Sequence, residues 1–264
     1  MLNKMQKLSQ SLLETLQEVY NILLKDGLSR NYKTYKVTFY LQTPIALSWP
    51  FIHLDGIMLH RYLLAILGQK YYYVHTARID LSEIFKVTLG KTLEEEGYMP
   101  VVDKWKDLYK ATALEFGMHK RHVEVLYKRF EDRFYEKGTV RIGTGTFRSF
   151  AEKFIYINPK MATGVIRMDA KWVELLYKIP ALGDDTRTGW GIVKKVEVEE
   201  LNDEFVIVQE GIAKRVIPVD YLKYYKGKPI GIAYKPPYWL IDNVNLCVIP
   251  GTEVEIKEDE KDGS

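Results

Sequence analysis

A glycine-rich stretch is the first candidate for chemistry in this sequence. Residues 181–200 read ALGDDTRTGWGIVKKVEVEE, in which Gly183, Gly189 and Gly191 surround Arg187 and Thr188. Three glycines exceed what a plain turn requires, so they indicate a backbone that passes close to another group. A guanidinium, a hydroxyl and exposed backbone amides bind phosphate oxygens. We therefore predict a site for a sugar-phosphate backbone at Arg187, Thr188, Gly189, Trp190 and Gly191; the alternative is a tight connection between a helix and a strand.

A second candidate is a basic segment, residues 118–148, in which aromatic residues lie among the charges. It contains eight lysines or arginines against four acids. Because cations contact phosphates and aromatic rings stack on bases, this composition favours single-stranded RNA. We predict a long hairpin with a basic tip; the alternatives are a helix over residues 120–135 and a solvated surface hairpin. The predicted RNA contacts are Lys120, Arg121, Arg129, Arg133, Arg141 and Arg148.

Two histidines are candidates for acid–base catalysis. His53 and His60 lie on either side of Asp55, close enough along the chain to approach each other. Histidine is a common general acid or base, and His53 is also a candidate for holding a phosphate. A structural role is the alternative for both residues. No paired-carboxylate or G-x-S-x-G motif indicates a known hydrolase.

Metal and cofactor chemistry find little support in the sequence. His119 and His122 are close in the chain, but no acidic or cysteine partner lies at ligand spacing. We therefore predict no metal site and no cofactor. Cys247 is the single cysteine, which excludes an internal disulfide and a cysteine zinc site. That usage fits a reducing, cytoplasmic setting.

The overall composition permits a nucleic-acid partner without requiring one. The chain has 264 residues, 47% of them hydrophobic, and a formal net charge of +3. The tail over residues 256–264 holds two lysines and four acids, so the rest carries +3 − (2 − 4) = +5. We find no signal-peptide pattern and no apolar run of about 18 residues, so we expect no membrane association.

The elements that must position these residues follow from periodicity. Apolar residues at three- and four-residue steps predict helices over residues 8–24, 56–67, with Asp55 as its N-cap, and 169–179, with Asp169 as its N-cap. Alternation predicts strands over residues 35–41 and 191–200, and further strands after residue 200. Strand, helix, irregular strands, helix and strand give the βαββαβ order. We predict an α+β fold with a ferredoxin-like (RRM-like) domain.

The expected domains follow from this order. Residues 1–30 form an N-terminal helical extension, and residues 31–200 form the ferredoxin-like domain. A thumb-like insertion occupies about residues 112–150 of that domain. Residues 201–255 form a β-rich C-terminal extension, and residues 256–264 form the acidic tail.

Several short motifs together resemble one known family. They are Leu54-Asp55-Gly56, Leu182-Gly183 followed by Arg187, Gly189-Trp190-Gly191, Arg215 with Ile217-Pro218, and Pro236-Pro237-Tyr238-Trp239. The set resembles the handle-capping subunits of the RAMP superfamily in CRISPR effector complexes, and is most similar to the type IV version. One departure is that Asp184 and Asp185 follow Leu182-Gly183, where family members usually carry basic residues.

The resemblance implies a non-enzymatic, RNA-binding subunit that caps the 5′ handle of a CRISPR RNA. It also implies backbone and large subunits as partners, and target DNA in the assembled complex. The first alternative is a metal-independent endoribonuclease of the same superfamily that uses His53 or His60 to process precursor CRISPR RNA. The second is a stand-alone RRM-like RNA-binding protein.

Overall fold

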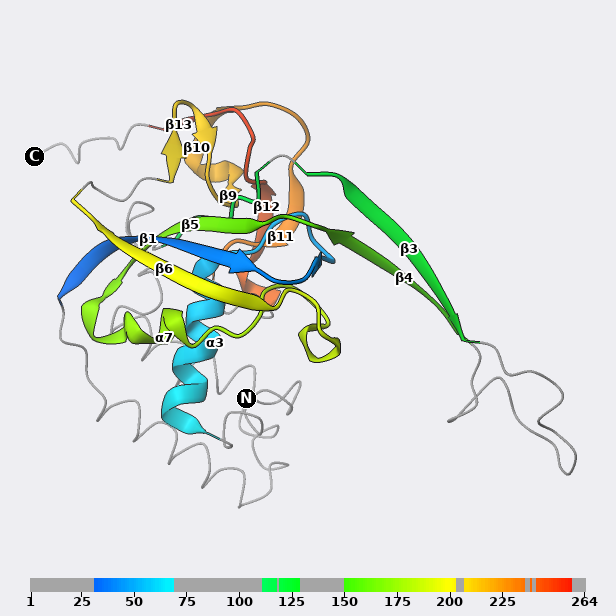
Figure 1. Cartoon of the computed structure of the whole chain (residues 1–264). Coiled ribbons are helices and arrows are strands. Elements are labelled where there is room, and N and C mark those ends of the chain that lie inside the picture. The colour runs from blue at the N-terminus through cyan, green and yellow to red at the C-terminus, as the bar shows by residue number, and fades with distance from the viewer. Residues whose placement is uncertain are drawn as a thin grey trace, which may run out of the picture.

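The computed structural model describes residues 31–68, 111–117, 119–128, 150–202, 207–235, 238 and 241–257. It confirms an α+β fold in which every described strand pair is antiparallel and the described helices are few (Figure 1). The N-terminal segment, residues 69–110 with the irregular strands expected there, the residues around the predicted hairpin tip and residues 258–264 of the acidic tail lie outside the described residues.

A three-stranded sheet forms the centre of the fold. Strand β1 (Tyr32–Leu41) lies between β5 (Met161–Asp169) and β6 (Val193–Leu201) and pairs antiparallel with both. Along β1, the side chains of Tyr35, Val37 and Phe39 are buried, whereas Lys36 between them is exposed. This is the period-two pattern that predicted the strand, so one face of the sheet faces the core.

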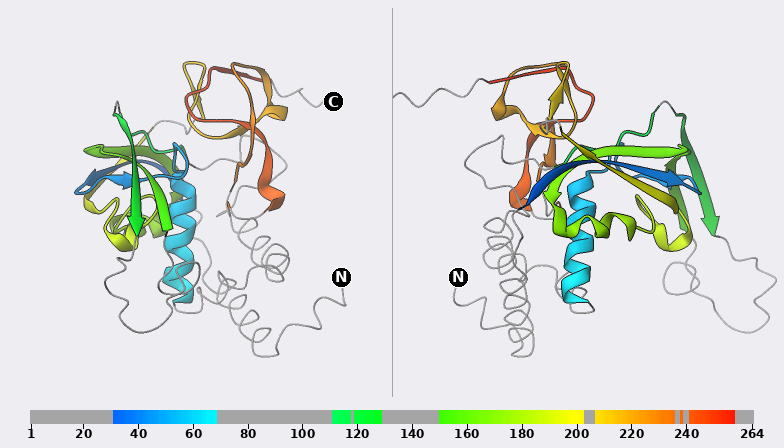
Figure 2. Two further views of the ribbon diagram at one scale, coloured as in Figure 1. Left: turned by 90° about the vertical axis from the view of Figure 1, so that its right-hand side faces the viewer. Right: turned by 60° about the vertical axis from the view of Figure 1, so that its left-hand side comes forward.

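Two helices cover the buried face of this sheet (Figure 2). Helix α3 (Leu54–Leu67) contacts β5, and the short helix α7 (Glu174–Tyr177) contacts β6. Leu54, Leu176 and Leu182 are almost fully buried in the resulting core. The helix predicted over residues 56–67 is therefore confirmed and begins two residues earlier.

Two details of the helix predictions are wrong. His53 rather than Asp55 is the N-cap residue of α3, because the carboxylate of Asp55 is engaged elsewhere, as described below. The helix expected over residues 169–179 is broken into the 3-10 helix η3 (Ala170–Trp172) and α7. Asp169 does cap this region, since its side chain accepts a hydrogen bond from the backbone N–H of Lys171.

Residues 111–117 lie along the other edge of β5. Ala111 forms a bridge with Ile166, and Glu115 forms a bridge with Thr163. The backbone N–H of Thr112 donates to the carbonyl of Val165 over 2.8 Å. The order across this part of the molecule is therefore β6, β1, β5 and then residues 111–117.

The predicted long hairpin is confirmed at its base, which excludes the alternative helix over residues 120–135 there. Strand β3 (Arg121–Lys128) pairs antiparallel with β4 (Phe150–Ile157) through eight residue pairs. The other edge of β4 pairs antiparallel with β2 (Ile45–Ala46). The two strands extend away from the central sheet (Figure 1).

The C-terminal part forms small antiparallel sheets with a core of their own. Ile217, Leu222, Val248 and Val254 belong to this second core. Its elements are β7 (Val208–Gln209), β8 (Ile212–Ala213), β9 (Ile217–Pro218), η5 (Val219–Tyr221), β10 (Leu222–Tyr225), β11 (Ile230–Ala233), η6 (Ile241–Asn243), β12 (Val244–Val248) and β13 (Val254–Ile256). The sheets are β7-β8, β10-β13 and β11-β12-β9.

Among the helices described, none is long and apolar enough to cross a membrane.

Candidate nucleic-acid interface

A run of three aromatic rings joins the two segments that the sequence predicted to bind RNA. His122 on β3 lies opposite Tyr156 on β4, and their rings stack with centroids 5.1 Å apart. The ring of Tyr156 also lies 5.1 Å from that of Trp190 in the glycine-rich turn. His122 is exposed, and Tyr156 and Trp190 are half-buried. The hairpin and the turn therefore share one aromatic surface, which we call the aromatic run.

The glycine-rich turn is held firmly against the chain that follows β1. The backbone N–H of Gly191 donates to the carbonyl of Pro44 over 2.7 Å. The hydroxyl of Thr43 donates to the carbonyl of Gly189 and accepts from the N–H of Ile192. Trp190 thus sits between two anchored residues, so its ring has a defined position relative to β4.

The three glycines of this region serve different purposes. A side chain on Gly191 would lie 1.8 Å from the carbonyl oxygen of Leu182, and one on Gly183 would lie 2.5 Å from that of Ala46. The packing of the chain itself therefore accounts for these two glycines. Gly189 has φ +99°, and a methyl group placed on its Cα would have no other atom within 4 Å, so its face is open to an approaching chain.

The exposed side chains of the turn differ in whether a bond inside the protein already engages them. Arg187 and Thr188 belong to the 3-10 helix η4 (Thr186–Thr188) and are exposed. The hydroxyl of Thr188 already donates to the carbonyl of Asp185, whereas no ion pair of Arg187 occurs within the described part of the chain. Arg187 is therefore the side chain of this turn best suited to meet a phosphate.

Two of the six predicted RNA-contacting cations of the hairpin lie within the described residues. Lys120 and Arg121 are exposed at the base of the hairpin. Because side chains alternate along a strand, Arg121 lies on the face of β3 opposite to His122, together with the exposed Val123. The remaining predicted contacts lie outside the described residues; they are Arg129, Arg133, Arg141 and Arg148.

His53 is buried, with 7% of its surface exposed. Its Nε2 accepts a hydrogen bond from the backbone N–H of Val216 over 3.2 Å, and its ring stacks on Tyr238 at 4.9 Å. Burial, and then the positive charge of Arg215, lowers the pKa of His53 from 6.5 to about 3, although Asp55 opposes this shift. The imidazole is therefore neutral at physiological pH and brings no positive charge to a phosphate.

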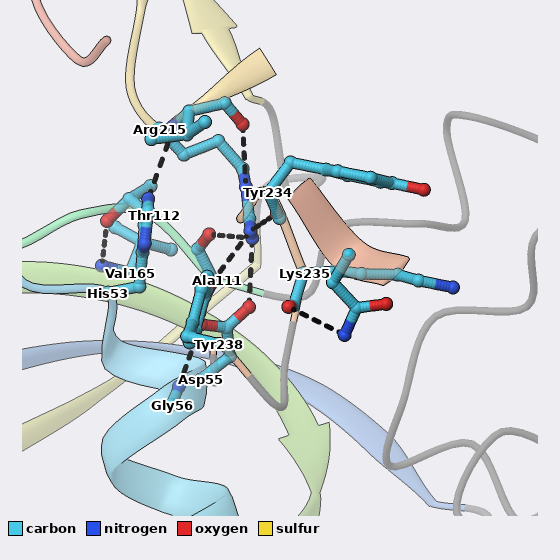
Figure 3. Close-up of polar contacts among 12 residues, drawn as sticks. His53, Asp55, Gly56, Ala111, Thr112, Val165, Arg215, Tyr234, Lys235 and Tyr238 are labelled. Carbon is cyan, nitrogen blue, oxygen red and sulfur yellow. Dashed lines mark hydrogen bonds and ion pairs between the residues drawn. The ribbon is translucent and has the colours of Figure 1, made fainter. Parts of the chain in front are cut away.

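A buried ion pair lies beside His53 (Figure 3). Arg215 is fully buried, and its Nη1 lies 2.9 Å from Oδ2 of Asp55 in the first turn of α3. The hydroxyl of Tyr238 donates to Oδ1 of Asp55 and accepts from Nη2 of Arg215. We call Asp55, Arg215, Tyr238 and His53 the buried junction, because they tie α3 to the C-terminal part.

The hydrogen-bonding capacity of Arg215 is completely used. Besides Asp55 and Tyr238, it donates to the carbonyls of Ala111, Tyr234 and Val216. All five guanidinium N–H groups thus have acceptors. Burial, and next the charge of Asp55, raises the pKa of Tyr238 well above 10, so its hydroxyl stays protonated and can donate.

Three of the motif blocks behind the family resemblance meet at this junction. Asp55, Arg215 and Tyr238 come from the L-D-G, R-x-I-P and P-P-Y-W blocks. Gly56 completes the set, because a side chain there would lie 2.9 Å from the ring of Tyr238. The sequence did not reveal this role, since Asp55 and Arg215 are 160 residues apart and no local pattern pairs them.

His60 is exposed on α3, and both His60 and His53 line one cleft beside the turn. The structure therefore brings the two histidines to the same hollow, although His53 has its accepting nitrogen engaged. Within the described residues, no group of three histidine, cysteine, aspartate or glutamate side chains is placed to hold a metal ion.

The exposed face of the central sheet is a second possible surface for RNA. An RRM-like protein stacks bases on aromatic rings of this face. Here Tyr40 donates its hydroxyl to Glu197 over 2.7 Å, and Glu199 lines the same shallow hollow. Lys36 also lines this hollow, and Lys195 forms an ion pair with Glu197, so the charges of this face largely balance. The stacked, partly exposed rings make the aromatic run the better candidate for the interface.

No family model matches the chain, and no curated protein matches it either. Among solved structures, the chain is similar to a chain of the structure described as "Cryo-EM structure of the Type III-B Cmr-beta bound to cognate target RNA". The two are 13% identical, with a TM-score of 0.35, over 71% of this chain and 67% of that chain.

Proposed function

We propose that this chain is an RNA-binding subunit of a type IV-like CRISPR effector complex and caps the 5′ handle of the CRISPR RNA. The identity of the complex comes from the resemblance of the motifs. The observation that carries RNA binding is the aromatic run from His122 through Tyr156 to Trp190. It connects a hairpin with exposed cations to a turn with an exposed arginine.

In this proposal, the aromatic run binds the bases of a single strand and the turn binds its sugar-phosphate backbone. Partly exposed rings stack on bases, and such stacking contributes about 1–3 kcal/mol per base. Arg187 supplies a positive charge to a phosphate, and the open face of Gly189 lets the RNA backbone approach the protein backbone. Lys120 and the predicted contacts Arg129, Arg133, Arg141 and Arg148 would extend the path of positive charge, whereas Arg121 lies on the face of β3 opposite to His122.

The central sheet supports the ferredoxin-like interpretation of the α+β fold. The order β6, β1, β5 and residues 111–117 matches a βαββαβ domain whose fourth strand lies beside the first and whose third lies beside the second. In that comparison, α3 and α7 take the places of the two helices, and residues 111–117 take the place of the second strand.

The proposed partners are the CRISPR RNA, the backbone and large subunits of the complex, and target DNA in the assembled particle. They follow from the same resemblance. A stand-alone RRM-like protein is less favoured, because the stacked rings lie on the hairpin and the glycine-rich turn rather than on the exposed face of the sheet.

The decisive experiment measures binding of a repeat-derived RNA to the purified chain by fluorescence anisotropy. Tyr156→Leu and Trp190→Leu each remove one ring, so we expect Kd to rise about 5- to 150-fold. Tyr224→Leu is the matched control, because Tyr224 is 49% exposed on β10, outside the proposed interface. Unchanged Kd in both ring variants, with their folds intact by circular dichroism, would contradict the proposal.

We further propose that the chain is not an enzyme. His53 has its accepting nitrogen bonded to Val216 and a pKa of about 3, so it is neither a free base nor a proton donor at neutral pH. Incubated with a precursor RNA in EDTA, the chain should protect the 5′ handle from an added nuclease and cut nothing. Site-specific cutting that is lost in His60→Ala would establish the endoribonuclease alternative instead.

A further inference from the structure

A cleft of about 660 Å³ lies next to the glycine-rich turn. One wall is residues 47–52 and the start of α3, the second is residues 181–186, and the third comes from β11 and β12. Its volume falls in the range of small-molecule sites, which is about 300–1,000 Å³. Because the wall over residues 181–186 continues directly into Arg187, a strand lying on the turn passes the mouth of this cleft.

Aromatic rings form the apolar lining of the cleft. The rings of Trp49 and Phe51 are 6.3 Å apart, those of Phe51 and His53 are 5.3 Å apart, and His53 stacks on Tyr238. The inner end of this series is buried, whereas Trp49 at its outer end is 50% exposed. A large, half-exposed indole at the mouth of a cleft is a ready stacking surface for a planar ring.

The charges of the lining favour a neutral ligand over a phosphate. Among the described residues that line it, there is neither lysine nor arginine, and His53 is neutral. The one carboxylate in that lining belongs to Asp184. Inside the cleft, this carboxylate repels a phosphate and accepts hydrogen bonds from neutral donors instead, while Arg187 lies outside the lining.

The carboxylate of Asp184 is held in place by the backbone. Its Oδ2 accepts a hydrogen bond from the N–H of Ser48, and its own N–H donates to the carbonyl of Ala46. The described part of the chain offers Oδ1 no hydrogen bond. A fixed carboxylate oxygen beside aromatic rings can accept a hydrogen bond from an N–H group of a planar ligand.

Building on the proposed function, we propose that this cleft takes one unpaired RNA base turned out of the bound strand. Asp184 would accept hydrogen bonds from the Watson–Crick edge of that base. Guanine presents two donors there, its N1–H and its amino group, so it fits best. Uracil fits worst, since its single N–H lies between two carbonyl oxygens. The acidic residue at this place in the motif thus acts on a base rather than on a phosphate.

The test compares two short RNAs of equal length, one made only of uridine and one with a single guanosine at its centre. Because the uridines on either side are equivalent, the strand can slide until the guanosine reaches the cleft, whatever the register of first binding. We expect the full chain to bind the guanosine strand about 10-fold more tightly, as one well-made pair of base contacts provides. A strand with inosine, which keeps N1–H and lacks the amino group, should fall between them.

Asp184→Asn tests the residue itself. An asparagine keeps an oxygen for the N–H of Ser48 but offers an amide donor in place of the second oxygen, so the preference for guanosine should vanish. Asp185→Asn is the matched control, because it removes the same charge from an exposed neighbour that does not line the cleft. It should leave the preference at about 10-fold.

The outcomes separate the inference from the function on which it rests. If the native chain binds both strands equally, the cleft reads no base, and a segment of a neighbouring protein becomes its better occupant. An equal loss of preference in both aspartate variants would assign the effect to charge alone and also overturn the inference. If neither strand binds, the proposed function fails, and this inference fails with it.

Discussion

The buried junction and the glycine-rich turn contain the same kinds of residue but use them in opposite ways. At the junction, every N–H of Arg215 is bonded inside the protein, and Gly56 makes room for the ring of Tyr238. At the turn, Arg187 is exposed, and Gly189 leaves its face open. An arginine or glycine within a family motif is therefore not by itself a sign of ligand binding.

The motif blocks therefore have two different roles, stabilising the fold or contacting a ligand. The L-D-G, R-x-I-P and P-P-Y-W blocks stabilise the contact between α3 and the C-terminal part, whereas the G-W-G block presents a ring and a backbone to the exterior. Substitutions at the junction should therefore change the free energy of unfolding. Substitutions in the open part of the turn should change RNA binding.

Arg215→Met should have the largest effect, because it leaves the carboxylate of Asp55 buried without its cation. Breaking a buried pair in this way costs about 3–5 kcal/mol of the free energy of unfolding. The matched control is Lys214→Met, which breaks the neighbouring ion pair with Glu115 at the surface. That pair is worth about 0–1 kcal/mol, and urea denaturation measures both. Equal losses in the two variants would show that Arg215 is not a structural clamp.

The two glycines at the end of the turn should respond differently to alanine. Gly191→Ala forces a methyl group onto the carbonyl of Leu182 at φ +65°, so we expect a loss of about 2–4 kcal/mol in stability. Gly189→Ala meets no atom and carries only the strain of positive φ, about 1 kcal/mol. Thermal denaturation compares them. A Gly189→Ala variant that loses as much stability as Gly191→Ala would contradict an open face at residue 189.

His53 makes stability depend on pH. Its pKa is about 3 in the folded chain and 6.5 in the unfolded chain, so the unfolded state binds more protons between these values. The free energy of unfolding should therefore fall as the pH drops below 6.5, by up to about 1.4 kcal/mol per pH unit, or about 2 kcal/mol by about pH 5. His53→Gln keeps an acceptor for Val216 but does not titrate, so this part of the slope should disappear. A variant with the native slope would contradict a buried, neutral His53.

The smallest effect concerns the salt dependence of RNA binding. Arg187→Ala should reduce the slope of log K against log salt by about 0.7, because one phosphate contact on a single strand is lost. Arg121 is the matched arginine, since it lies on the face of β3 opposite to His122. Arg121→Ala should leave the slope almost unchanged. The reverse result would move the RNA path to the other face of the hairpin.

The sequence alone determined the elements whose pattern is local. The alternation around Val37 and Phe39 predicted β1, the apolar residues after Asp55 predicted α3, and the α+β class followed from their order. The long hairpin was also predicted, but the sequence left a helix over residues 120–135 as its alternative, and the pairing of β3 with β4 decided between them at the base. Such patterns depend on which side of each element is buried, and the spacing of apolar residues along the element shows that side.

Only the tertiary structure decided which residues meet. Asp55 satisfies Arg215 across 160 residues instead of capping its own helix, and Tyr156 acquires a role because antiparallel register places it opposite His122 and beside Trp190. The glycines look alike in sequence, yet a carbonyl faces Gly191 and open space faces Gly189. These outcomes depend on atoms distant in the chain, whose approach is fixed by packing and hydrogen bonding of the whole fold rather than by local periodicity.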